Sequence, residues 1–167
     1  QNKFVEALAA LMELATGNLQ DAQVWLLVGL VYTRMAHWQN AIDVLKTALQ
    51  LDPSNNSAKQ LMSLALFSIG QKEEACKLID AVCKSGSATG PQWMLRAYLH
   101  QHTSSDPMHS LAVARDWGKR FADPLTRAAK PLRVKDRGPR KRLKIGYVTA
   151  DFREHSVAFF MQPVLAH

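Results

Sequence analysis

The sequence predicts a mostly α-helical protein, in which a solenoid of helical repeats is followed by the first strand and helix of a βαβ unit. Three observations support this fold class. Apolar and small residues recur along most of the chain with a 34-residue period that is typical of helical repeats. Prolines and basic residues then interrupt the pattern over 122–142. After residue 142 the apolar residues change from helical to strand-like spacing.

The clearest repeat spans residues 22–55. Its key positions match the 34-residue tetratricopeptide pattern of two antiparallel helices: Trp25, Gly29, Tyr32, Ala41, Leu45 and Pro53. Asp21 is a suitable N-cap for the first helix, and Gly29 should let the second helix approach closely. A unit of this kind cannot bury its apolar face alone, so it needs stacked neighbours.

Neighbouring units with the same spacing are expected on both sides. Residues 1–21 form a partial repeat that contributes one helix, and residues 56–89 form the next full repeat. Residues 90–121 are an irregular cap of two helices, whose second helix is expected to end near Phe121 because Pro124 follows.

Charge and cysteine content limit the classes of function. The net charge is +7, and the segment 130–144 alone carries eight Lys/Arg and one Asp, so the rest of the chain is neutral. Cys76 and Cys83 lie on one predicted helix, about 10 Å apart along its axis, which is too far for a disulfide. We therefore expect reduced thiols and a cytoplasmic protein. No apolar run is long enough to span a bilayer, so no membrane partner is expected.

The basic segment allows two interpretations. It could bind nucleic acid or act as a nuclear import signal. Its prolines and glycine, however, break any helix that would present the charges together, so we interpret 122–142 as a solvated interdomain linker and expect no nucleic-acid partner.

The remaining residues, 143–167, have a different pattern. Leu143–Thr149 is a short apolar run that indicates a buried strand. A loop over 150–155 and a helix over 156–166 follow, with Pro163 as a kink or early break. This order is the first half of a βαβ unit.

The segment RLKIGYVTADFREHSV, residues 142–157, resembles the opening of the catalytic region of the O-linked N-acetylglucosamine transferases. In that family the motif also follows tetratricopeptide repeats. The resemblance implies that 143–167 begin the N-terminal lobe of a GT-B catalytic region. Leu27 and Leu61 stand where eukaryotic members carry asparagines, so the chain looks closer to a bacterial, SPINDLY-like branch.

The resemblance implies an enzyme, a UDP-GlcNAc protein O-glycosyltransferase. It would transfer N-acetylglucosamine from UDP-GlcNAc to Ser/Thr hydroxyls of a protein or peptide acceptor with inversion, and the solenoid would guide the acceptor. UDP-GlcNAc is a substrate, and neither a cofactor nor a metal is expected. Most donor contacts would lie in the second lobe, so these 167 residues alone should be inactive.

His155 is the candidate catalytic residue, because it matches the family's active-site histidine. It lies in the loop after a predicted first strand, where open α/β sheets bind ligands, and before a helix N-terminus, whose free N–H groups suit a phosphate. An imidazole there could accept a proton from the acceptor hydroxyl or hydrogen-bond the diphosphate. The sequence does not decide between the two roles.

Two alternative functions remain. A protein O-fucosyltransferase that uses GDP-fucose would have the same architecture, and a repeat scaffold that binds peptides would have no activity. His100, His102 and His109 are interpreted as part of a solvated turn, since their spacing fits no metal-binding pattern.

Overall fold

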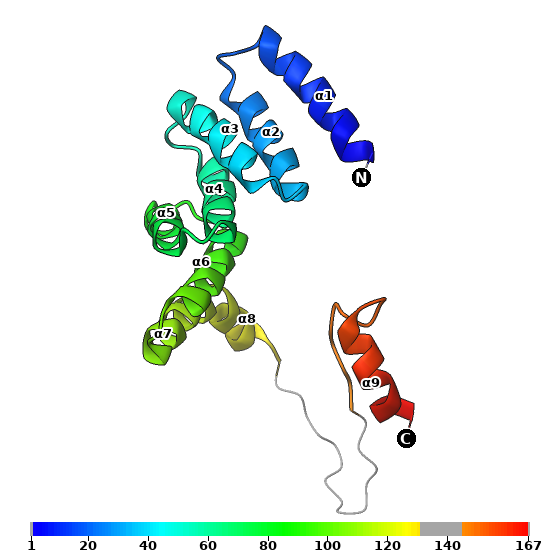
Figure 1. Ribbon diagram of the computed structural model, residues 1–167. Helices are drawn as coiled ribbons and strands as arrows, with labels where there is room; N and C mark the ends of the chain where they lie inside the picture. Colours follow the sequence, from blue (N-terminus) through cyan, green and yellow to red (C-terminus); the bar gives the residue numbers. More distant parts are fainter. Residues whose placement is uncertain (1, 131–144, 167) are drawn as a thin grey trace, which may run out of the picture. The chain divides into compact units, whose positions relative to one another are not determined.

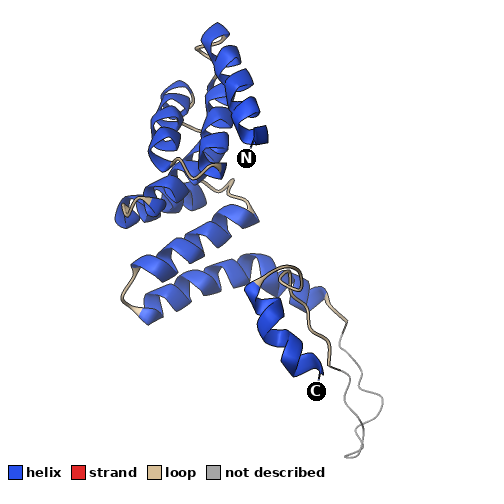
Figure 2. Ribbon diagram, turned by 45° about the vertical axis from the view of Figure 1, so that its right-hand side comes forward, coloured by secondary structure: helices blue, strands red, loops and turns tan. Residues whose placement is uncertain are grey.

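The computed structural model describes residues 2–130 and 145–166 of the protein. They belong to two compact units, Gln1–Ala129 and Lys130–His167, which are described separately below. In the described residues of the first unit, helices joined by short loops are the only regular secondary structure, and those of the second unit contain one helix (Figures 1 and 2).

The first unit is a helical solenoid in which each helix packs against the next along the chain, and α4 also contacts α2 and α6. Its first seven helices are α1 (Asn2–Gly17), α2 (Ala22–Arg34), α3 (Trp38–Leu51), α4 (Asn56–Ser68), α5 (Lys72–Lys84), α6 (Gly90–Thr103) and α7 (Pro107–Trp117). The predicted tetratricopeptide-type solenoid is confirmed.

Asp or Asn side chains cap the N-termini of three of these helices. The carboxylate of Asp21 accepts the N–H of Gln23 at 2.8 Å and starts α2. Asn55 starts α4 and Asp106 starts α7 in the same way. The cap at Asp21 confirms the prediction, which rests on the preference for Asp at helix N-termini, where its oxygen satisfies an N–H group that has no partner within the helix.

Gly29 allows α2 and α3 to approach closely, as the repeat pattern predicts. A Cβ atom built on Gly29 would lie 2.6 Å from both Cγ and Cδ2 of Leu45. Leu45 is completely buried, together with Ala41 and Ala48 on the same helix. The core therefore depends on small residues at the positions where the helices touch.

The helical path extends beyond the predicted end near Phe121. A π-helical turn (Gly118–Ala122) follows α7 and leads directly into α8 (Asp123–Ala128). Pro124 did not end the helix, because it lies in the first turn of α8, where a missing N–H costs no hydrogen bond. The predicted linker 122–142 thus starts inside helical structure, and most of its basic run lies in 131–144, outside the described residues.

The second unit contains α9 (Ser156–Ala166), which continues past Pro163 rather than breaking there. The predicted strand over 143–149 is wrong for the described residues 145–149. These residues have no regular secondary structure and are exposed to solvent, and the side chain of Ile145 is 71% exposed. A strand forms through hydrogen bonds to a neighbouring strand, and the described residues contain no strand that could pair with it. Residues 143 and 144 lie outside the described part.

None of the helices in residues 2–130 and 145–166 is long and apolar enough to cross a membrane.

Candidate functional site

His155 lies immediately before α9 and acts as its cap. Its backbone carbonyl accepts the N–H groups of Ala158 at 3.0 Å and Phe159 at 3.4 Å. Its ring Nδ1 accepts the N–H of Val157 at 3.3 Å. The imidazole is half-buried. Three backbone N–H groups in the first turn of α9 are therefore bonded to His155 itself, which corrects the expectation that they are free to bind a phosphate.

The capping bond determines what His155 can do chemically. Because Nδ1 accepts a hydrogen bond, the neutral ring carries its proton on Nε2. In this conformation Nε2 can donate to an anionic oxygen but cannot accept a proton. The structure therefore favours a hydrogen-bonding role over general base catalysis, unless the capping bond breaks. The assignment of His155 to an active site stays a prediction.

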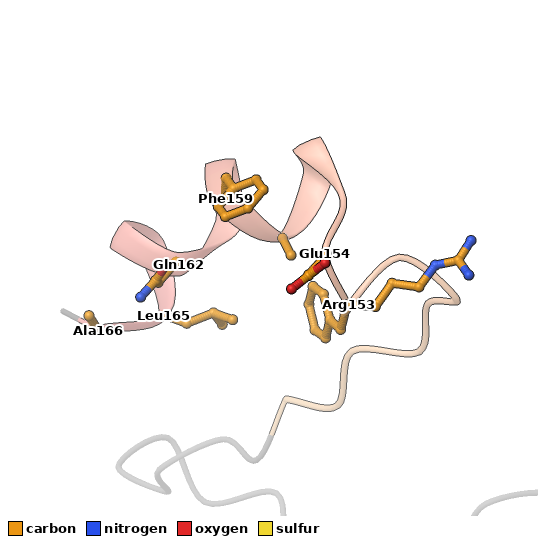
Figure 3. A pocket seen from close by; sticks show the side chains of 8 residues that line it. Arg153, Glu154, Phe159, Gln162, Leu165 and Ala166 are labelled. Carbon is orange, nitrogen blue, oxygen red and sulfur yellow. The ribbon is translucent and has the colours of Figure 1, made fainter.

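A hollow of about 540 Å³ adjoins α9 (Figure 3). Its lining residues come from the loop and the helix of the second unit: Phe152, Arg153, Glu154, Ala158, Phe159, Gln162, Leu165 and Ala166. The guanidinium of Arg153 points away from the helix in Figure 3. Phe159 and Leu165 are 66% and 51% exposed. His155 does not line the hollow, and the exposed apolar side chains suggest a packing surface rather than a catalytic pocket.

A second group of polar residues joins α5, α6 and α7 in the solenoid. The carboxylate oxygen Oδ1 of Asp80 accepts a hydrogen bond from Arg96 Nε at 2.6 Å and lies 3.1 Å from His100 Nε2. The other ring nitrogen of His100 lies 3.0 Å from Nε2 of His109. We call these four residues the Asp80 network.

The hydrogen bonds of the Asp80 network fit one arrangement of protons in the neutral rings. His100 Nε2 donates to Asp80, which leaves His100 Nδ1 to accept the Nε2 proton of His109. Burial raises the pKa of Asp80, but the hydrogen bonds from Arg96 and His100 outweigh it and hold the pKa below its usual value. Asp80 is therefore an ionised carboxylate at neutral pH.

The Asp80 network corrects the interpretation of the histidines as a solvated turn. His100 lies inside α6 and is only 9% exposed, whereas His102 and His109 are exposed. The repeat register could have revealed this, because His100 falls on the position of Leu66, 34 residues earlier, and of Tyr32, 68 residues earlier. No cluster of three or more potential metal ligands occurs within the described ranges.

Both cysteines are buried and form no disulfide, as the spacing predicted. Burial raises the pKa of Cys76, and it raises the pKa of the Cys83 thiol to about 11. Neutral thiols are poor nucleophiles, so neither residue is a candidate for covalent catalysis.

No protein-family model matches the chain, and no curated protein matches it. Several solved structures do match the chain. The chain resembles a lysine-to-methionine mutant of the O-GlcNAc transferase from Thermobaculum terrenum, with 25% identity and a TM-score of 0.77. The match covers 97% of this chain and 31% of the transferase chain, so the chain spans about a third of that protein.

The solenoid has a tetratricopeptide fold. A second match, to MamA, has 17% identity and a TM-score of 0.59 and covers 71% of this chain and 67% of MamA, which supports the fold alone. The matches support an architecture like that of the transferase, and they give no support to the SPINDLY-like branch. They leave the enzyme activity and the nucleotide sugar as proposals.

Proposed function

We propose that this tetratricopeptide chain is part of an inverting glycosyltransferase that moves N-acetylglucosamine from UDP-GlcNAc to Ser/Thr hydroxyls of proteins. The observation that carries the proposal is the match to the Thermobaculum terrenum transferase over 97% of the chain. Since the solenoid unit ends at Ala129, a match of this length includes residues of the second unit, where His155 lies.

The solenoid would guide the polypeptide acceptor. Stacked repeats form extended surfaces that suit peptide segments. A groove of about 480 Å³ between α6 and α7 has an apolar lining with two polar side chains: Met94, Ala97, Tyr98, Gln101, Ser110, Leu111 and Ala114. Such a lining can pack apolar side chains of an acceptor and hydrogen-bond its backbone.

In the reaction, the oxygen of the acceptor hydroxyl forms a bond to the anomeric carbon while the bond from that carbon to the diphosphate oxygen breaks. UDP leaves, and the proton of the hydroxyl passes to a base. The Nε2 proton of His155 suits the diphosphate, whose negative charge grows as the sugar departs. His155 is therefore proposed as the donor of a hydrogen bond to the leaving group.

Donor binding tests this proposal. Isothermal titration calorimetry should be performed on the full natural protein that contains this sequence, with UDP-GlcNAc and GDP-fucose in parallel. Binding of UDP-GlcNAc alone is the expected result, whereas selective binding of GDP-fucose would favour the O-fucosyltransferase alternative. Binding of neither donor would favour a peptide-binding scaffold, which the fold shared with MamA also allows.

The role of His155 is tested by two substitutions. His155→Asn keeps an oxygen that can cap α9 and an N–H₂ group that can donate, whereas His155→Ala keeps neither. We expect UDP-GlcNAc hydrolysis to fall by about 10²-fold or more in His155→Ala and to be partly retained in His155→Asn. Equal, near-complete loss in both variants would indicate that the ring acts as a base.

A further inference from the structure

A pocket of about 390 Å³ at the C-terminal end of the solenoid shares no lining residue with the groove between α6 and α7. Trp93 of α6 and Asp116 of α7 line it, together with Lys119 and Arg120 of the π-helical turn. We call it the Trp93 pocket. All four residues belong to the first unit.

The charges in the Trp93 pocket do not balance. Asp116 is paired with Arg96, whose NH1 atom lies 3.5 Å from Oδ2 of Asp116. Lys119 and Arg120 form no ion pair with an acidic residue of the described chain. The pocket therefore presents two cations that have no ion pair among the described residues and one carboxylate, Asp116, which shares the guanidinium of Arg96 with Asp80.

The indole of Trp93 contacts one of the two cations, Arg120. The guanidinium of Arg120 lies 4.5 Å from the centroid of the Trp93 ring, and that of Arg96 lies 5.4 Å from it. Cation–π contacts of this length limit the freedom of a long side chain. Trp93 is half-buried, so the indole also offers apolar surface inside the pocket.

The π-helical turn places both cations at the pocket. An extra residue in a helical turn changes the direction of the side chains that follow it, and single π turns occur often at functional sites. Here the turn interrupts a helical path over 107–128 and carries Lys119 and Arg120. The local distortion and the unpaired charges thus coincide in the same five residues, Gly118–Ala122.

We propose that the Trp93 pocket binds the side chain of a glutamate in a polypeptide. The carboxylate would pair with Lys119 and Arg120, and the two methylene groups would pack against the indole. A phosphate is disfavoured, because phosphate sites usually add free backbone N–H groups, and those of Gly118 and Asp123 are bonded within the helix. The inference deepens the proposed function, on which it rests, by assigning a sequence preference to the acceptor.

The test is binding of short peptides to the 167-residue chain, observed at the indole N–H signals of its four tryptophans by nuclear magnetic resonance. Trp93→Phe assigns the signal of Trp93. One peptide contains a central Ser flanked by Glu, the second replaces each Glu with Gln, and inorganic phosphate is the third ligand.

The protein variant that tests the pocket is Lys119→Gln/Arg120→Gln. The matched control is Lys46→Gln/Lys77→Gln, which removes the same charge at exposed positions on α3 and α5.

The Glu peptide should shift the Trp93 signal, and the Gln peptide and phosphate should not. The pocket variant should weaken binding about tenfold, as expected for the loss of two partly exposed charge pairs, while the control should bind like the wild type. Equal binding of both peptides, or equal weakening in both double variants, would overturn the proposal. A shift with phosphate alone would also overturn it, in favour of a phosphate site. Because no sugar transfer is measured, failure here is distinguishable from failure of the proposed enzyme activity.

Discussion

Substitution of Gly29 by alanine tests the packing on which the solenoid depends. The new Cβ would lie 2.6 Å from Cγ and Cδ2 of Leu45 and 3.4 Å from Cδ1. Favourable carbon–carbon contacts lie at about 3.5–4.0 Å, so one of the two helices must move by roughly 1 Å. Leu45 cannot turn into solvent, because it is completely buried.

Two opposing effects determine the magnitude. Alanine is favoured over glycine in a helix by about 1 kcal/mol, whereas overpacking of a filled core costs about 1–3 kcal/mol. Gly118→Ala is the matched control, since Gly118 has helical backbone angles and nothing lies within 4 Å of its Cβ position. The free energy of unfolding of Gly29→Ala should therefore be about 1–3 kcal/mol below that of Gly118→Ala.

Urea denaturation followed by circular dichroism measures both free energies. The double variant Gly29→Ala/Leu45→Ala should be more stable than the sum of the single effects predicts, because the methyl group at residue 29 fills part of the space left by Leu45. If Gly29→Ala is as stable as Gly118→Ala, the close approach of α2 and α3 does not hold, and the reasoning fails.

Two further predictions concern buried groups. Asp80→Asn should lower the free energy of unfolding by about 1.5–3 kcal/mol at pH 7, since Arg96 and His100 lose a charged acceptor. The folded-state pKa of Asp80 is depressed, so its contribution is fully present above the unfolded pKa of about 3.9 and is lost progressively as the pH falls through the folded value. The difference in unfolding free energy between wild type and variant should therefore be smaller at pH 3 than at pH 7, and a constant difference would contradict the assignment. Cys76 and Cys83 should react with a disulfide reagent at pH 8 far more slowly in the folded chain than in urea, because burial raises both thiol pKa values; fast reaction of both thiols without denaturant would show that they are accessible.

The solenoid could be predicted from the sequence because its signals are local and periodic. Gly29 and Leu45 stand at fixed positions of the 34-residue pattern, and the cap at Asp21 depends only on adjacent residues. The extension through Pro124 could not be predicted, since a proline is compatible either with a helix end or with the first turn of a new helix.

The candidate sites were less predictable, because they depend on contacts between distant residues. Asp80 and His100 meet only because α5 packs against α6. The three histidines were interpreted as a solvated turn, although His100 occupies the repeat position of Leu66. The hydrogen bond from the N–H of Val157 to the ring of His155 could be found only from the structure. The sequence motif that indicates an active-site histidine says nothing about which ring nitrogen carries the proton.

Transfer of labelled N-acetylglucosamine from UDP-GlcNAc to a Ser-containing polypeptide, catalysed by the full natural protein, tests the central claim most directly. We predict that label appears on the polypeptide with release of UDP, that replacement of the acceptor Ser by Ala abolishes it, and that His155→Ala reduces it strongly. A protein that binds the polypeptide but transfers no sugar from UDP-GlcNAc would contradict the proposed transferase function.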